Sequence, residues 1–400
     1  MRRLAAFACS LVIIAACSDG GSDSSSETPQ GAPTVAKTEP TITEPAATTT
    51  VPAATSTEPA ATSTVPATTT TEPRAQYAAT IDELLAIGRP IVLAHTAGED
   101  EFPASTLFAF GESVKAGVDM LDLNLNITAD DELVVQHDDT VDRNTDGAGA
   151  VASMTMDQIR ELDAAYWFST DCADCRDLPG NAYLYRGVRT GSQPAPMGYT
   201  ADDFALPTLR ELVERFPDLP LNIEIKGAGE MARKAADVLA AELVELGRAD
   251  ASVVASFDDE VVSYFHSIAP DIEVSPGLNV LTAYVLNETP IPDGMRILQL
   301  PPEFSGLTVI TPELVARSNA DDLPIWVWPN DRRLENYDAY LAFLQQGIAG
   351  PNINFPEQGV QAVRDFIRPG ALRAAEPTAA CTTDAAALEP TLPCRSTLPG

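Results

Sequence analysis

Short apolar runs alternate with amphipathic stretches from Ile81 onward, and this alternation constrains the fold more than any other feature of the chain. The runs have the length of strands, and helical patterns separate most of them. Strand–helix alternation over about 290 residues is typical of a parallel sheet closed into a barrel. The sequence therefore predicts an α/β protein with a TIM-type (β/α)8 barrel. The apolar runs cover residues 91–95, 118–125, 132–137, 220–226, 252–256, 272–276, 296–300, 324–328 and 350–353.

These nine runs exceed the eight strands of such a barrel by one. We expect 132–137 to lie outside the barrel, because the preceding Thr128 to Asp131 reads as a tight turn and not as a crossover. Helical spacing of apolar residues is clearest at 106–116, 208–216, 230–246, 258–268 and 337–346.

The first 17 residues read as a targeting segment. Arg2 and Arg3 precede a short apolar stretch, Leu4 to Ala16, which is too short to span a bilayer stably. The stretch ends in Ile-Ala-Ala-Cys17, which resembles a bacterial lipobox; the resemblance implies cleavage before Cys17 and lipid on its thiol. The alternative is an ordinary signal peptide with an incidental cysteine. In both cases we expect export, either to the outer face of the bacterial cell membrane as a lipoprotein or into the medium.

Residues 18–76 consist mainly of Thr, Pro, Ala, Ser and Glu, and the segment TEPAATTTVPAAT at Thr43 recurs almost unchanged at Thr57. This composition cannot bury enough apolar surface to offset ordering the backbone, so we expect a disordered tether. The tether would precede the barrel domain, 77–370, and a loop-rich tail would follow at 371–400.

The formal net charge of −33 excludes some partners. Nucleic acids need clusters of Lys and Arg, and so does electrostatic adhesion to anionic lipid heads. An acidic chain does suit recruitment of Ca²⁺ or Mg²⁺.

Four cysteines remain if the signal is removed and Cys17 is lipidated: Cys172, Cys175, Cys381 and Cys394. In an oxidising compartment they allow three pairings, of which we favour Cys172 with Cys175 and Cys381 with Cys394. A redox or zinc role for the first pair is less favoured, since no histidine accompanies the second. The first pair lies in an irregular segment, 164–206, whose aromatic residues favour an ordered cap near the active face.

Two of the three histidines stand at the ends of strand-like runs. His95 ends 91–95, and His137 ends 132–137, whereas His266 lies in a helical stretch and reads as a surface residue. A histidine at a strand end is often only a hydrogen-bonded structural residue. Because barrel chemistry lies at the carboxyl ends of the strands, the two together predict a pair able to move protons near neutral pH.

Acidic and amide side chains occur on the neighbouring runs. Asp122 and Asn124 share one face of their strand because side chains alternate, and Glu224 and Lys226 share a face of theirs. Oxygen ligands from two strands predict a site for Ca²⁺ or Mg²⁺. A solvated loop around Asp122, or a Glu224–Lys226 ion pair, is the structural alternative.

The stretch AGVDMLDLNLNITADDELVVQHDDTVDRNTDGAGAVASMTMDQIRELDA, with Glu224-Ile225-Lys226 and Trp326 to Asn330, resembles the glycerophosphodiester phosphodiesterase family. The resemblance implies cleavage of a glycerophosphodiester to glycerol 3-phosphate and an alcohol. It also implies roles by position. His95 and His137 would be the acid–base pair, Asp122, Asn124 and Glu224 the ligands of a divalent metal, and Lys226 the contact to the substrate phosphate.

Three positions depart from the family pattern. Thr96 replaces an arginine that follows the first histidine, Ala104 replaces a glutamate, and Asn124 replaces an aspartate. These changes remove a phosphate contact and two negative charges, for which Glu99 or Glu101 could substitute. Metal-dependent hydrolysis by two histidines is the leading hypothesis. The alternatives are a catalytically impaired barrel that binds a phosphodiester or glycan at the cell surface, and a lyase acting on lysolipid phosphodiesters.

Overall fold

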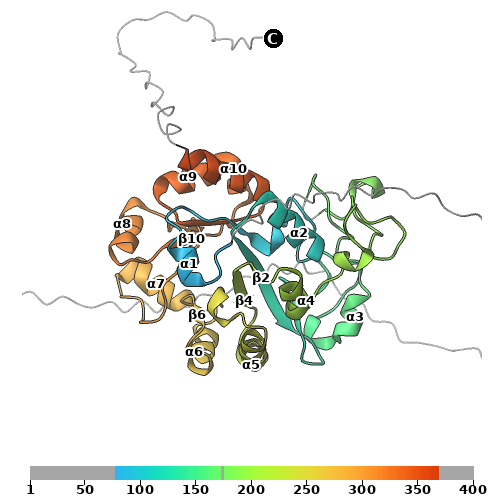
Figure 1. The fold of residues 1–400 in the computed structure, drawn as a ribbon, viewed down its shortest axis with the longest axis horizontal. Coiled ribbons are helices and arrows are strands. Elements are labelled where there is room, and N and C mark those ends of the chain that lie inside the picture. Colours follow the sequence, from blue (N-terminus) through green and yellow to red (C-terminus); the bar gives the residue numbers. More distant parts are fainter. Residues whose placement is uncertain (1–76, 173–174, 369–400) are drawn as a thin grey trace, which may run out of the picture. The chain divides into compact units, whose positions relative to one another are not determined.

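The computed structural model describes residues 77–172 and 175–368, and its centre is one curved sheet of parallel strands (Figure 1). The strand order is β6-β5-β4-β2-β1-β11-β10-β7. The edge strands approach each other, since Ser275 Oγ, just after β6, donates to the carbonyl of Ile297, just before β7, at 3.2 Å. The predicted TIM-type barrel is confirmed. Its strands are β1 (Leu93–Ala94), β2 (Met120–Ile127), β4 (Leu221–Ile225), β5 (Ser252–Ala255), β6 (Glu273–Val274), β7 (Leu298–Leu300), β10 (Ile325–Val327) and β11 (Gly350–Ile353).

The ninth run forms β3 (Leu133–Val135), which lies outside the barrel as predicted. It pairs antiparallel with the far end of β2, Leu125 opposite Val135. Asn126 closes this hairpin by donating to the carbonyls of Gln136 and Asp138 at 2.8 and 2.9 Å. Because β3 runs antiparallel to β2, the hairpin returns the chain toward the carboxyl ends of the barrel strands, and His137 lies there.

Helices surround the strands in chain order (Figure 1). Most begin at a side chain that accepts a hydrogen bond from a backbone amide of the first turn; Thr106, Thr208 and Asp258 are examples. Such caps contribute about 1 kcal/mol each. The helices are α1 (Ile81–Leu85), α2 (Leu107–Ala116), α3 (Met156–Arg160), α4 (Leu209–Arg215), α5 (Gly229–Glu245), α6 (Asp259–Ile268), α7 (Leu278–Asn287), α8 (Pro312–Ala320), α9 (Tyr337–Gln346) and α10 (Pro356–Ile367).

Two of the buried apolar clusters leave the carboxyl end of the barrel to polar side chains. Leu121, Leu123 and Leu125 of β2 point outward into the main apolar cluster under the helices. A second cluster joins Ile81 and Leu84 of α1 to the residues Met120, Val253 and Trp326 near the amino ends of the strands. Helix α1 thus closes that end, and the polar side chains occupy the carboxyl end.

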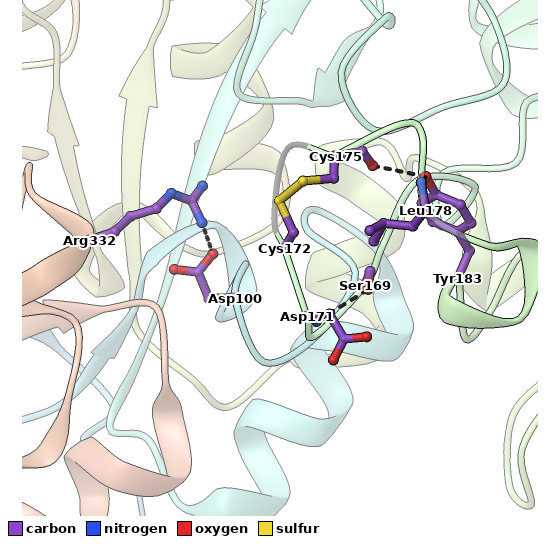
Figure 2. Close-up of a disulfide and its surroundings, with 8 residues drawn as sticks. All are labelled: Asp100, Ser169, Asp171, Cys172, Cys175, Leu178, Tyr183 and Arg332. Atoms are coloured by element: carbon purple, nitrogen blue, oxygen red, sulfur yellow. Dashed lines mark hydrogen bonds and ion pairs between the residues drawn. A yellow bond between two sulfur atoms is a disulfide. The ribbon is translucent and has the colours of Figure 1, made fainter.

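The insertion 164–206 packs beside α2. Phe108 of α2 stacks on Phe204, with ring centroids 4.6 Å apart, and also contacts Tyr185 and Tyr199. A disulfide joins Cys172 to Cys175, and the ion pair between Asp100 and Arg332 lies in its surroundings (Figure 2). The insertion thus approaches the rim of the active face.

Several sequence predictions fall on residues that the structure does not describe. The signal at 1–17, the lipidation site Cys17, the tether, and the Cys381–Cys394 pair lie outside the described residues. Among the helices of the described part, none is long and apolar enough to cross a membrane.

Candidate active site

A pocket of about 320 Å³ opens at the carboxyl end of the barrel. All six residues that the sequence predicted for catalysis, metal and phosphate line this pocket, although they come from four separate segments. They are His95, Asp122, Asn124, His137, Glu224 and Lys226.

Strand register explains why the acidic and amide side chains meet. In the parallel pairing of β2 with β4, Asp122 is opposite Asn222 and Asn124 is opposite Glu224. Since side chains alternate along both strands, these four residues face the barrel interior at neighbouring levels. Asn222 belongs to the same alternating set as Glu224 and Lys226, a signal that the sequence analysis missed.

His95 follows β1 directly and begins a short 3₁₀ turn, His95–Ala97. Its Nδ1 lies 2.8 Å from Asn354 Oδ1. The Nδ2 of Asn354 donates to Asp100 at 2.8 Å and to Glu99 at 3.4 Å, which fixes the orientation of the amide because carboxylates only accept. The His95 Nδ1 therefore carries the proton that Asn354 Oδ1 accepts, and Nε2 is the atom available to a substrate.

His137 is oriented in the same way by a charged partner. Its Nδ1 lies 2.7 Å from Asp138 Oδ1, and Arg143 Nε donates to the second oxygen of that carboxylate at 2.7 Å. His137 and Arg143 hold the pKa of Asp138 well below its usual range against the opposing effect of burial. Asp138 thus stays ionised and keeps Nε2 of His137 as a proton acceptor.

Glu99 links the two histidines electrostatically. It accepts from Arg143 at 3.1 Å and lies 3.8 Å from His95 Nδ1. Burial opposes ionisation of Glu99, but His95 and Arg143 lower its pKa to about 2. Burial likewise opposes the charged form of His95, yet Glu99 and Asp122 raise the pKa of that imidazole above its ordinary value. These two carboxylates therefore favour the protonated form of His95.

Compensation by Glu99 or Glu101 for the missing acid stays a prediction, and the structure does not place either carboxylate in the pocket. Glu99 is held by His95 and Arg143, and Glu101 accepts from the backbone amide of Glu357 at the start of α10, at 3.1 Å. His266 is half-buried on α6, and it too is absent from the pocket wall.

Asp122 is buried beneath the pocket and is held from two sides. Its Oδ1 accepts from Asn222 Nδ2 at 2.5 Å, and Oδ2 accepts from the amide of Thr96 at 3.3 Å. Thr96 has φ 44° and ψ 38°, a left-handed conformation that is strained for a β-branched residue. Burial raises the pKa of Asp122, and the nearby Glu224 adds to this effect. The site thus concentrates negative charge that a cation would neutralise.

The oxygen atoms of Asp122, Asn124 and Glu224 fit a hard divalent cation, although only two of these three side chains can carry a negative charge. Asp122 and Glu224 supply carboxylates and Asn124 an amide oxygen, the ligand types that Ca²⁺ and Mg²⁺ prefer. Asn124 Nδ2 is buried without a hydrogen-bond partner, so no donor–acceptor contact fixes that amide group. Within the described residues no cluster of three or more His, Cys, Asp or Glu suits a metal. A cation here would therefore need the Asn124 oxygen and water.

Lys226 supplies positive charge next to these acids. Its Nζ lies 3.2 Å from Glu224 Oε1, and both side chains line the pocket. A lysine here can bind a phosphate oxygen as a point charge.

Comparisons with known proteins show which proteins this chain is similar to. Residues 95–357 match the glycerophosphoryl diester phosphodiesterase family. A glycerophosphodiester phosphodiesterase of Caldanaerobacter subterraneus is 25% identical over 278 residues, which cover 69% of this chain and 98% of that protein. A similar enzyme of Bacillus altitudinis is 24% identical over 68% of this chain and 96% of its own length.

Two solved structures share the fold. A glycerophosphoryl diester phosphodiesterase domain from Mycobacterium tuberculosis has a TM-score of 0.55 at 21% identity, covering 68% of this chain and 98% of that chain. A phosphodiesterase from Oleispira antarctica, solved with its product sn-glycerol-3-phosphate, has a TM-score of 0.51 at 17% identity, covering 70% and 99%. The extent of the family match shows that this chain belongs to the glycerophosphoryl diester phosphodiesterase family, a family of phosphoric diester hydrolases.

Proposed function

We propose that this protein hydrolyses glycerophosphodiesters to glycerol 3-phosphate and an alcohol by acid–base catalysis between two histidines. The observation that carries the proposal is the pairing of His95 and His137 in one pocket, with ring centroids 5.9 Å apart and Nδ1 of each engaged by an acceptor. Both Nε2 atoms then remain for the substrate. Membership of the family and the product bound to the Oleispira antarctica protein support the same reaction.

The surroundings of the two rings support different roles for them. His137, oriented by ionised Asp138, takes the proton from the attacking water or from a glycerol hydroxyl of the substrate. His95, whose pKa is raised by Glu99 and Asp122 in spite of burial, donates its Nε2 proton to the departing alkoxide as the phosphorus–oxygen bond breaks. Lys226 binds a phosphate oxygen.

Asp122, Asn124 and Glu224 would hold a divalent cation, Ca²⁺ or Mg²⁺. When bound, the cation neutralises charge on the phosphate oxygens and on the attacking oxygen.

The test is release of alcohol from glycerophosphocholine and glycerophosphoethanolamine, with each metal and with chelator. We expect metal-stimulated turnover that is lost in His137→Ala and retained in His266→Ala, a matched control because His266 lies outside the pocket. Product analysis distinguishes the alternatives. A cyclic phosphate would establish the lyase, and binding without turnover by the folded protein would establish the impaired binder.

We also propose that Cys17 carries lipid and tethers the barrel to the outer face of the cell membrane. Support comes from the lipobox-like Ile-Ala-Ala-Cys sequence and the Thr/Pro-rich segment after it. Mass spectrometry of the mature N-terminus tests the proposal. The proposal would be overturned by an unmodified Cys17 in the membrane-extracted protein. It would also be overturned if the Cys17→Ser variant stayed bound to membranes.

A further inference from the structure

The pocket has two unlike ends. One end holds the histidines and the acids, and the other is bounded by α7, by the hairpin of β8 (Glu303–Phe304) and β9 (Leu307–Thr308), and by Trp328. The second end is mostly apolar. A glycerophosphodiester with a small polar head group would gain little from contact with this apolar surface.

Helix α7 presents an apolar stripe to this pocket, and two residues of the stripe, Leu281 and Val285, also pack against the main apolar cluster. Leu278, Leu281, Val285 and Leu286 all line the pocket, and their spacing places them on one face of the helix. The helix has no charged residue, and Tyr284 is its only fully buried member. Tyr284 faces α8, where its hydroxyl donates to Asp321 at 2.9 Å. The helix is therefore anchored through Tyr284, while its apolar stripe, half-buried at Leu281 and Val285 and exposed at Leu286, lines the pocket.

The hairpin opposite adds two further apolar side chains, Phe304 and Leu307. Leu286 is 57% exposed and Leu307 is 54% exposed, so both lose hydration only when something covers them. Asn330 steadies the hairpin by donating to the carbonyl of Glu303 at 2.7 Å. Contiguous exposed apolar surface beside a polar site is typical of ligand binding.

We propose that this apolar groove, formed by α7 and the β8–β9 hairpin, binds the hydrocarbon chain of a monoacyl phosphodiester, that is, a lysophospholipid. The inference rests on the proposed function and names its substrate class. Continuity carries it, because a single pocket joins the groove to His95, His137 and Lys226, so that one molecule can fill both ends. A sugar or charged head group in the groove would lose hydration with few hydrogen-bonding partners in return.

The reaction is then hydrolysis of the diester on its head-group side. Water adds across the phosphorus–oxygen bond, the head-group alkoxide takes up a proton, and the products are an acylglycerol 3-phosphate and the alcohol. The acyl chain stays in the groove throughout.

The experiment compares choline release from glycerophosphocholine with release from butanoyl-, hexanoyl- and octanoyl-lysophosphatidylcholine, each below its micellar concentration. We expect kcat/KM to rise by up to about fourfold per added methylene until the groove is filled. In Leu286→Ser and Leu307→Ser the ratio of octanoyl to deacylated substrate should fall at least tenfold. Leu184→Ser is the control, since Leu184 is 48% exposed and lies outside the pocket.

The outcomes test acyl-chain binding in the groove and hydrolysis at the histidines separately. Turnover of glycerophosphocholine with no gain from the acyl chain would overturn the groove and leave the proposed function standing. If no substrate is turned over, calorimetric titration of the same series decides. Binding that tightens with chain length and weakens in Leu286→Ser would support the groove and count against the hydrolase, whereas binding independent of chain length would overturn the groove as well.

Discussion

The imidazole rings of His95 and His137 lie 5.9 Å apart between centroids and stand at 78° to each other. A neutral amide, Asn354, orients the first ring, and an ionised carboxylate, Asp138, orients the second. Arg143 spans the two environments, since it donates to both Asp138 and Glu99. The two histidines therefore differ in their electrostatic surroundings although both offer Nε2, and this difference supports the proposed assignment of one acid and one base.

Replacing Asp138 with asparagine tests the assigned base. The amide removes the charge that fixes the tautomer of His137, so we expect kcat to fall by roughly 10²- to 10⁴-fold while the fold is kept. Steady-state kinetics and circular dichroism measure both effects. Asp139→Asn changes the adjacent, exposed aspartate in the same way and should have little effect. Equal losses in the two variants would contradict the dyad.

The Glu99→Gln substitution tests the assigned acid. Glu99 raises the pKa of His95, so removing its charge lowers that pKa and His95 loses its proton at lower pH. The alkaline limb of the profile of kcat/KM against pH should then move to lower pH. Glu101→Gln is the control, because burial raises the pKa of Glu101 to about 7 but that residue lies outside the pocket. If only the control moves the limb, His95 is not the acid.

Glu335 couples stability to pH. Burial raises its pKa to about 7 even though Tyr340 and the Asn354 amide donate to it at 2.5 and 2.9 Å. Because this pKa lies above the unfolded value, the associated stability is fully present below about pH 4.5 and is lost as pH rises through about 7. The effect is on the order of 3 kcal/mol.

Glu335→Gln should therefore stabilise the protein more at pH 8 than at pH 4, since the amide mimics the protonated acid. Urea denaturation at both values measures the free energy of unfolding. The exposed Glu161→Gln provides the comparison. A gain that does not depend on pH would rule out this titration.

Asn124→Asp tests the cation site. The change restores a carboxylate between Asp122 and Glu224, so Ca²⁺ or Mg²⁺ should bind at least about tenfold more tightly. Calorimetry and the shift of the melting temperature with metal report binding without reference to activity. Asn319→Asp adds the same charge on the outside of α8 and should not change affinity. Unchanged affinity in Asn124→Asp would place the cation elsewhere.

The sequence by itself determined the barrel and the residues of its catalytic end. Alternation along one strand depends only on local geometry, so the shared faces of Asp122 with Asn124, and of Glu224 with Lys226, could be predicted without neighbours. A different local signal, the tight turn at Thr128 to Asp131, identified 132–137 as the strand outside the barrel.

Only the tertiary structure decided which partners surround the two histidines. Asn354, which follows β11, reaches His95 across more than 250 residues of sequence, and Glu99 pairs with Arg143 and does not line the pocket. The apolar groove likewise depends on which face of α7 meets α8, and spacing within one helix cannot specify this. Contacts between residues far apart in sequence depend on how whole helices and strands pack. That packing is fixed only when the barrel has formed.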